Sequence, residues 1–153
     1  MEELISLRKE LHQNPELSGF EKETAVRIQN YLSKYPPTKL LTNIGGTGIL
    51  AIYEGKEKGK TILLRCELDA LPIQEINSFD HKSKVDNISH KCGHDGHMAI
   101  LCGVAKYLFQ NSLEKGNVVL LFQPSEENGN GAEMVLKDPF FKNINILLSL
   151  NIL

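Results

Sequence analysis

The sequence contains no tryptophan, and only 7% of its 153 residues are aromatic. It also lacks a run of about 20 apolar residues, which a membrane-spanning helix requires. Residues 1–5 include two glutamates and do not open an apolar stretch of the kind found in secretory signals. We therefore expect a cytoplasmic protein without a membrane segment.

A surplus of positive charge is absent as well. Seventeen lysine and arginine residues stand against 19 acidic residues, which gives a net charge of -2. Nucleic acids and anionic membranes attract clusters of basic side chains, and this balance provides no such attraction. The composition favours a small-molecule partner, and we expect neither a nucleic acid nor a membrane as a partner.

Cysteine is scarce, with three residues in the chain. An odd number without a secretory signal argues against a disulfide framework. Cys66 and Cys102 continue or lie within apolar runs, so we expect them to pack in the core. Cys92 lies among lysine, histidine, aspartate and glycine, and this polar setting favours a chemical role.

Hydrophobic residues make up 41% of the chain, enough for one core, and predict a single domain over residues 1–153. Apolar positions three and four apart predict a helix over residues 2–13. A second helix is predicted to follow a capping box formed by Ser18 and Glu21. The predicted order then continues with strands at 49–53 and 61–65, a helix at 98–109, a strand at 118–122, a helix at 132–136 and a strand at 144–150.

Strands that alternate with helices predict an α/β fold. Runs that are apolar on both faces, such as residues 118–122, predict a sheet covered by helices on both sides, with parallel neighbours in at least part of it. The glycine cluster at residues 45–48 predicts a turn, because no helix follows at once, as a phosphate-binding loop would need. Residues 73–91 are polar and show no clear period, which is typical of a long functional loop.

Candidate reactive side chains follow the predicted strands. Glu67 and Asp69 come after one strand, Glu126 and Glu127 come after another, and residues 92–97 lead into a helix. Ligands of open α/β sheets bind at the carboxyl ends of the strands. We therefore expect these separate segments to converge in space.

Cys92 and His94 are two positions apart, and on a helix they would point about 200° away from each other. They therefore need a loop if they are to act together. Thiolate and imidazole groups suit zinc or a similar divalent transition metal. Of Glu126 and Glu127, one carboxylate could bind the metal while the other takes a proton from metal-bound water.

Structural interpretations of several polar residues stay open. Glu126 and Glu127 could form a solvated turn. His81 and His90 lie in the polar stretch and are more typical of the surface than of a site. His12 could cap the carboxyl end of its helix.

A different chemistry for Cys92 also stays open. Cys92 could be a nucleophile, with His94 or His97 as its base and with help from the amino end of the following helix. A nucleophilic thiol would be alkylated quickly with or without a chelator, whereas a metal ligand would react only after the metal is removed.

Four segments carry a resemblance to a known family. They are residues 11–18 (LHQNPELS) with Glu21 and Thr24, 65–72 (RCELDALP), 92–97 (CGHDGH) and 122–127 (FQPSEE) with Gly131 and Ala132. In this order and spacing, the sequence resembles the M20 metallopeptidases. It is most similar to the amidohydrolase branch, which includes aminoacylases, hippurate hydrolases and the hydrolases of indole-acetyl amino-acid conjugates.

The resemblance implies a zinc-peptidase-like catalytic domain with a mixed, helix-covered sheet. It also implies two divalent metal ions (Zn, Mn or Co), with Cys92, His94 and Glu127 as ligands. Glu126 would be the general base that activates a bridging water, and Asp69 would orient a ligand. The implied reaction is hydrolysis of the amide bond of N-acyl amino acids or related small amides.

The sequence departs from the family pattern in several respects. Family members are much longer, so we expect this chain to be the amino-terminal part of the catalytic domain, truncated before an inserted lid and dimerisation domain. Asn151 stands where the pattern places a metal-binding histidine, and an amide is a poor substitute for imidazole. Glu67 stands where aspartate is more common.

These departures predict little or no amidase activity for this chain alone. The alternative is a non-catalytic remnant that at most binds a metal or a partner. An incomplete sheet would expose apolar surface, which would favour self-association into a homo-oligomer. Asp95 and His97 match the family motif, but the resemblance assigns no role to them.

Overall fold

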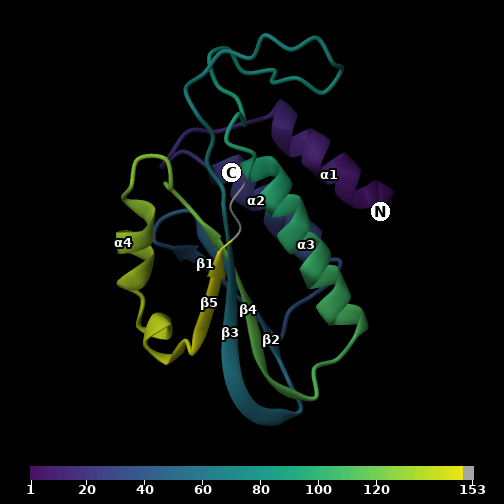
Figure 1. The fold of residues 1–153 in the computed structure, drawn as a ribbon, viewed down its shortest axis with the longest axis vertical. Coiled ribbons are helices and arrows are strands. Elements are labelled where there is room, and N and C mark those ends of the chain that lie inside the picture. Colours follow the sequence, from purple (N-terminus) through teal and green to yellow (C-terminus); the bar gives the residue numbers. More distant parts are fainter. Residues whose placement is uncertain (150–153) are drawn as a thin grey trace.

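A mixed sheet of five strands, in the order β1-β2-β4-β3-β5, forms the centre of the computed structural model, which describes residues 1–149 (Figure 1). β3 pairs in parallel with β4 and β5, whereas β2 pairs antiparallel with β1 and β4. The strands are β1 (Lys39–Ile44), β2 (Gly48–Glu54), β3 (Glu57–Glu67), β4 (Lys115–Gln123) and β5 (Ile146–Ser149).

Helices cover both faces of the sheet (Figure 1). One face carries α1 (Glu2–Gln13), α2 (Lys22–Leu32) and α3 (His94–Gln110), and the other carries α4 (Gly131–Leu136) and the 3-10 helix η1 (Pro139–Asn143). The predicted α/β class and the helix cover on both sides are therefore confirmed. No helix among residues 1–149 is long and apolar enough to cross a membrane.

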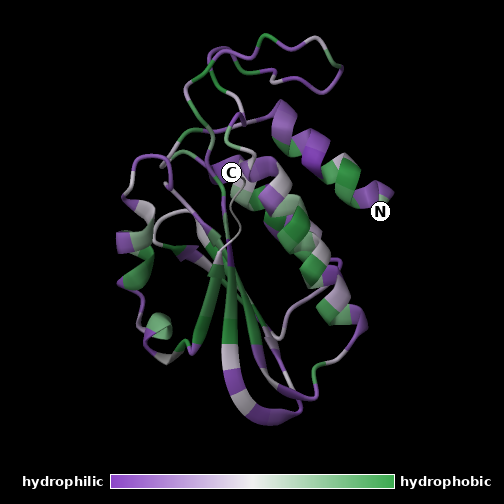
Figure 2. Cartoon of the chain, viewed as in Figure 1, coloured by the Kyte–Doolittle hydropathy of each residue, from purple (hydrophilic) through white to green (hydrophobic). Residues whose placement is uncertain are grey.

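The two faces of β4 explain its continuous apolar run. Leu120 and Phe122 pack in the core cluster beneath α1, α2 and α3, whereas Val119 and Leu121 pack in the opposite cluster, toward Val135 of α4. Alternate side chains of a strand point to opposite faces, so a strand buried on both faces is apolar throughout. Figure 2 shows the middle of the sheet as hydrophobic, whereas the first half of β3, at the bottom of the view, is hydrophilic.

The sequence did not predict β1, which is an edge strand. Five of its six residues are exposed, so it carries little of the apolar signal that identifies a strand. The glycine cluster after it forms the predicted turn, which joins β1 to β2. Gly45 adopts a positive φ of 60°, and a Cβ there would lie 2.8 Å from backbone and side-chain atoms of Val135.

The predicted capping box is wrong. Helix α2 starts at Lys22, its N-cap residue is Glu21, and that residue makes no side-chain cap hydrogen bond. Ser18 instead donates to Asp69 Oδ2 at 2.7 Å, and the fully buried Glu21 accepts from Ser125 N at 2.8 Å and Thr47 Oγ1 at 2.9 Å. Glu21 keeps one local bond, from Gly19 N at 2.9 Å, and its other backbone and side-chain donors come from distant segments.

The predicted long loop is confirmed. Residues 68–93 contain no helix and form only isolated bridges, which join Leu17 to Ala70 and Leu71 to Ser89. The loop lies over the carboxyl end of α1, at the top of Figure 1, and Lys84 N donates to Gln13 O at 2.9 Å. β5 matches the strand predicted over residues 144–150, whereas residue 150 and Asn151 lie outside the described residues.

We expect Phe122→Ala to lower the free energy of unfolding by about 3–5 kcal/mol, because Phe122 is 0% exposed and the truncation leaves a cavity. Phe20→Ala is the matched control, since Phe20 is 70% exposed and its change should stay within about 0.5 kcal/mol. Urea unfolding followed by circular dichroism measures both. Equal losses for the two variants would contradict the described core.

Candidate functional site

The parallel pairing of β3 and β4 brings two reactive segments to one edge of the sheet. Cys66 lies opposite Phe122 and Glu67 lies opposite Gln123, so both strands end side by side. Residues 67–69 and 125–127 therefore emerge together, next to the amino end of α3. The predicted convergence of separate segments is confirmed in the arrangement of these elements.

His94, the first residue of α3, lies between these two segments. Its Nε2 atom is 3.8 Å from Glu126 Oε2, 3.8 Å from Glu127 Oε1 and 3.9 Å from Glu67 Oε2. Its Nδ1 atom is 2.9 Å from the backbone oxygen of Asp69 and donates to it. A proton fixed on Nδ1 leaves the Nε2 lone pair directed at the carboxylates, as in a metal-binding histidine.

The surroundings of His94 favour a positive charge at this position. Burial lowers the pKa of His94, but hydrogen bonds to Asp69 and Cys92 outweigh burial and raise its pKa to about 11. Three carboxylates around one imidazole nitrogen create a strongly negative environment. Either a proton on the ring or a metal cation can balance that charge.

Cys92, His94 and Glu127 each place one ligand atom within 4.8 Å of the others. Gly93 makes this approach geometrically accessible, because its φ of 85° turns the chain between Cys92 and α3. Cys92 therefore lies in the loop, whereas His94 is the first residue of α3. One sulfur, one nitrogen and one oxygen donor form a set that fits zinc or a similar transition metal.

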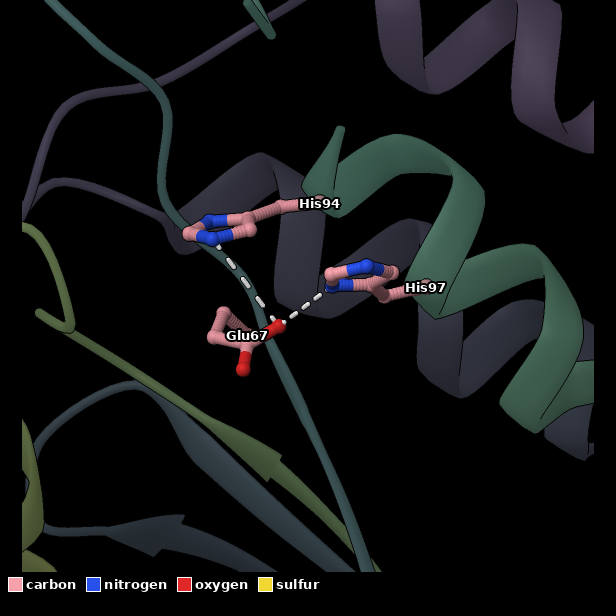
Figure 3. Close-up of side chains that lie close together, drawn as sticks. All are labelled: Glu67, His94 and His97. Atoms are coloured by element: carbon pink, nitrogen blue, oxygen red, sulfur yellow. Dashed lines mark hydrogen bonds and ion pairs between the residues drawn. The ribbon is translucent and has the colours of Figure 1, made fainter. Parts of the chain in front are cut away.

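A second group of possible ligands shares His94 (Figure 3). It consists of Glu67, His94 and His97, whose ligand atoms also lie within 4.8 Å of one another. His97 Nδ1 is 2.8 Å from Glu67 Oε2, and Arg65 Nη1 donates to Glu67 Oε1 at 2.6 Å. The buried His97 Nε2 has no hydrogen-bond partner among the described residues. Sequence reasoning considered His97 only as a possible base for Cys92 and not as a ligand, although its spacing of three from His94 places both on one helix face.

Asp69 links the other members of the site. Its Oδ2 atom accepts from Ser18 Oγ at 2.7 Å and from Glu127 N at 2.9 Å, and its Oδ1 atom is 3.5 Å from His94 Nδ1. Burial raises the pKa of Asp69, but hydrogen bonds from His94, Glu127 N and Ser18 outweigh burial and lower it. An ionised Asp69 therefore contacts the segments that carry His94 and Glu127.

Glu126 is the more solvent-accessible of the two adjacent carboxylates. Its side chain is 39% exposed, compared with 23% for Glu127. Burial raises the pKa of Glu126, the charge of His94 opposes the shift, and the charge of Glu127 adds to it. Residues 126–129 do form a turn, but both carboxylates face His94, so a merely solvated turn does not describe them.

Two predictions about histidines are wrong. His12 is 5% exposed and does not cap its helix, because its ring contacts Asp95 and Glu75. His90 is 3% exposed, and burial lowers its pKa to about 4. The expected packing of Cys66 and Cys102 is confirmed, since both are 0% exposed and burial raises the pKa of each thiol.

Comparisons with known proteins agree with the sequence motifs. The chain is 43% identical over 140 residues to the N-acetyldiaminopimelate deacetylase of Enterococcus faecalis, covering 92% of this chain and 37% of the relative. It is 39% identical over 149 residues to the N-acetylcysteine deacetylase of Bacillus subtilis, covering 97% and 39%. The chain thus spans less than two-fifths of the length of these relatives.

A solved structure shows the same fold. The YXEP protein of Bacillus subtilis, described as a dinuclear metal binding peptidase from the M20 family, superposes with a TM-score of 0.93 at 38% sequence identity. The match covers 98% of this chain and 42% of that protein. The sequence model of peptidase family M20/M25/M40 matches residues 63–152, more than half of the chain. The chain therefore belongs to peptidase family M20/M25/M40.

Proposed function

We propose that Cys92, His94 and Glu127 bind a divalent transition metal and that the site serves hydrolysis of the amide bond of N-acyl amino acids. The observation that carries the proposal is the environment of His94 Nε2, which faces carboxylates of Glu126 and Glu127 at 3.8 Å. A thiol belongs to the same cluster. A cation would balance the negative charge of this donor set, and a transition metal matches its sulfur and nitrogen atoms.

The known relatives support the reaction class. Two of them are named as deacetylases of N-acetylated amino acids, and the superposed structure is described as binding two metal ions. We therefore propose a small N-acyl amino acid or a related amide as the substrate. Zn, Mn and Co are the proposed metals, because all three accept imidazole and carboxylate ligands in open sites.

The proposed division of roles follows the contacts of each side chain. A bound metal would polarise the substrate carbonyl and make a water molecule more acidic. Glu126 would accept the proton of the attacking water, because it is the more exposed carboxylate and burial raises its pKa. Asp69 would hold the His94 ring and the Glu127 backbone in place through its hydrogen bonds.

The second candidate function is metal or partner binding without catalysis. It is favoured by the ligand count, since both clusters among residues 1–149 share His94 and offer three ligands each. Two separate ions would need more ligands than these clusters provide. Homo-oligomerisation stays a prediction.

Purified protein is expected to contain at least one equivalent of zinc, manganese or cobalt, and Cys92→Ala should lose most of it, because the variant removes the thiolate ligand. Cys102→Ala is the matched control, since Cys102 is a fully buried cysteine of α3 outside both clusters. Elemental analysis measures the metal, and circular dichroism checks the fold. Metal-free folded protein, or equal metal in both variants, would contradict the proposed ligands.

We expect the 153-residue chain alone to release little or no amine from N-acetyl amino acids, because the described residues offer too few ligands for two ions. A fluorescent amine assay with added zinc, manganese or cobalt measures turnover. Glu126→Gln is the control, since it removes the proposed base without removing a proposed ligand. Turnover that disappears in Glu126→Gln would show that this chain is catalytically sufficient and would overturn the expectation.

A further inference from the structure

A buried set of charged contacts lies beside the proposed metal ligands without including them. His12 of α1 places Nδ1 2.9 Å from Asp95 Oδ2 and Nε2 3.1 Å from Glu75 Oε1. All three residues are nearly inaccessible, with exposures of 5% for His12, 1% for Asp95 and 5% for Glu75. Each ring nitrogen of His12 lies within hydrogen-bond distance of one carboxylate.

Both carboxylates connect His12 to the segment that contains two of the proposed ligands, Cys92 and His94. Asp95 is the residue immediately after His94. Glu75 accepts from Lys91 Nζ at 2.8 Å, and Lys91 is the residue immediately before Cys92. His12 is therefore linked to both ends of the Cys92–Gly93–His94 segment.

Further contacts hold each carboxylate in place. Arg8, one turn before His12 on α1, donates to Asp95 Oδ2 at 3.0 Å. Glu75 also accepts from Ser83 N at 2.6 Å. Burial raises the pKa of Glu75, but hydrogen bonds from Lys91, Ser83 N and His12 outweigh burial and lower its pKa to about 2.

This network matters because the loop before α3 has little regular structure of its own. Residues 68–93 form only isolated bridges, so side-chain contacts fix much of their path. Ligands that are held in position bind a metal more tightly than ligands that must first be ordered. A rigid helix such as α1 is a suitable anchor for that purpose.

We propose that His12 is a positioning residue, which fixes the Cys92–Gly93–His94 segment through Asp95 and Glu75 and thereby sets the metal affinity. The metal part of this inference rests on the proposed function. The ordering of the segment by His12 does not, because it concerns the metal-free chain.

The test compares His12→Gln with Glu3→Gln in the full 153-residue chain. Glutamine carries both of its donor hydrogens on one nitrogen, so it cannot reach Asp95 and Glu75 from two separate atoms as the two ring nitrogens of His12 do, and His12→Gln weakens the link. Glu3 is also on α1 and accepts from Tyr35 Oη at 2.8 Å and Lys34 Nζ at 3.1 Å, far from the loop. It is therefore a matched control for the docking of α1.

The first readout is amide hydrogen exchange by NMR in metal-free protein. The amides of Gly93 and His97 donate to His90 O and Gly93 O at 3.2 Å each and report on the segment. We expect His12→Gln to accelerate their exchange at least tenfold relative to amides of β4, and Glu3→Gln to leave the ratio unchanged. An unchanged ratio in His12→Gln overturns the proposal.

The second readout is the dissociation constant for Zn²⁺, measured by competition with a chelating dye. We expect His12→Gln to weaken zinc binding by about 10- to 100-fold, the range seen when a residue behind a metal ligand is lost. In the double variant His12→Gln/Asp95→Asn, the loss of zinc-binding free energy should be smaller than the sum of the losses in the two single variants. Both substitutions break the same contact between His12 and Asp95. Faster exchange with unchanged affinity overturns the proposal.

The outcomes separate this proposal from the proposed function. If the unaltered chain binds no zinc, the proposed metal site is wrong, and amide exchange alone still decides whether His12 orders the segment. If His12→Gln does not fold, Lys91→Met is measured in the same way, because it removes the hydrogen bond that joins Glu75 to Lys91, the residue before Cys92. Unchanged exchange at Gly93 in Lys91→Met then overturns the proposal.

Discussion

Strands β3 and β4 pair in parallel from Thr61 opposite Asn117 to Glu67 opposite Gln123, and both end at the same edge of the sheet. Two carboxylate-bearing segments, residues 67–69 and 125–127, leave the sheet side by side as a result. Helix α3 packs on β3 with its amino end at this edge, which places His94 between them. The order of these two strands thus determines which reactive side chains can meet.

The cost of this arrangement is electrostatic. Glu67 and Asp69 are 1% and 0% exposed, and Glu126 and Glu127 lie close to the same imidazole. Buried carboxylates are stable only when cations or hydrogen-bond donors surround them. Glu67 is hydrogen-bonded to Arg65 and His97, and Asp69 accepts from Ser18 and the Glu127 amide. By contrast, the contacts of His94 Nε2 to Glu126 and Glu127 are 3.8 Å long, which exceeds hydrogen-bond distance. That unequal distribution of partners makes His94 the natural position for a cation.

Long-range polar contacts also explain where local interpretation failed. Glu21 looked like part of a capping box, but it joins turns around Thr47 and Ser125. His12 looked like a helix cap, but its partners Glu75 and Asp95 lie 63 and 83 residues away along the chain. Each side chain has the right chemistry for its local role but binds distant buried partners instead. The reason is that an unpaired buried charge costs more free energy than an uncapped helix end.

The sequence by itself determined most of the elements and predicted a set of candidate site residues. Apolar spacing and apolar runs identified α1, α3, β2 and β4, because these elements bury a periodic or continuous apolar surface. The residue types and their loop position indicated Cys92 and His94 as candidate ligands, and the resemblance to the M20 family added Glu127 as an expectation. Only the tertiary structure decided the edge strand β1, the contact between Glu67 and His97, and the burial of His12 and His90. These features depend on which segments become neighbours in the folded chain. Local sequence patterns do not predict contacts between residues that are far apart in the sequence.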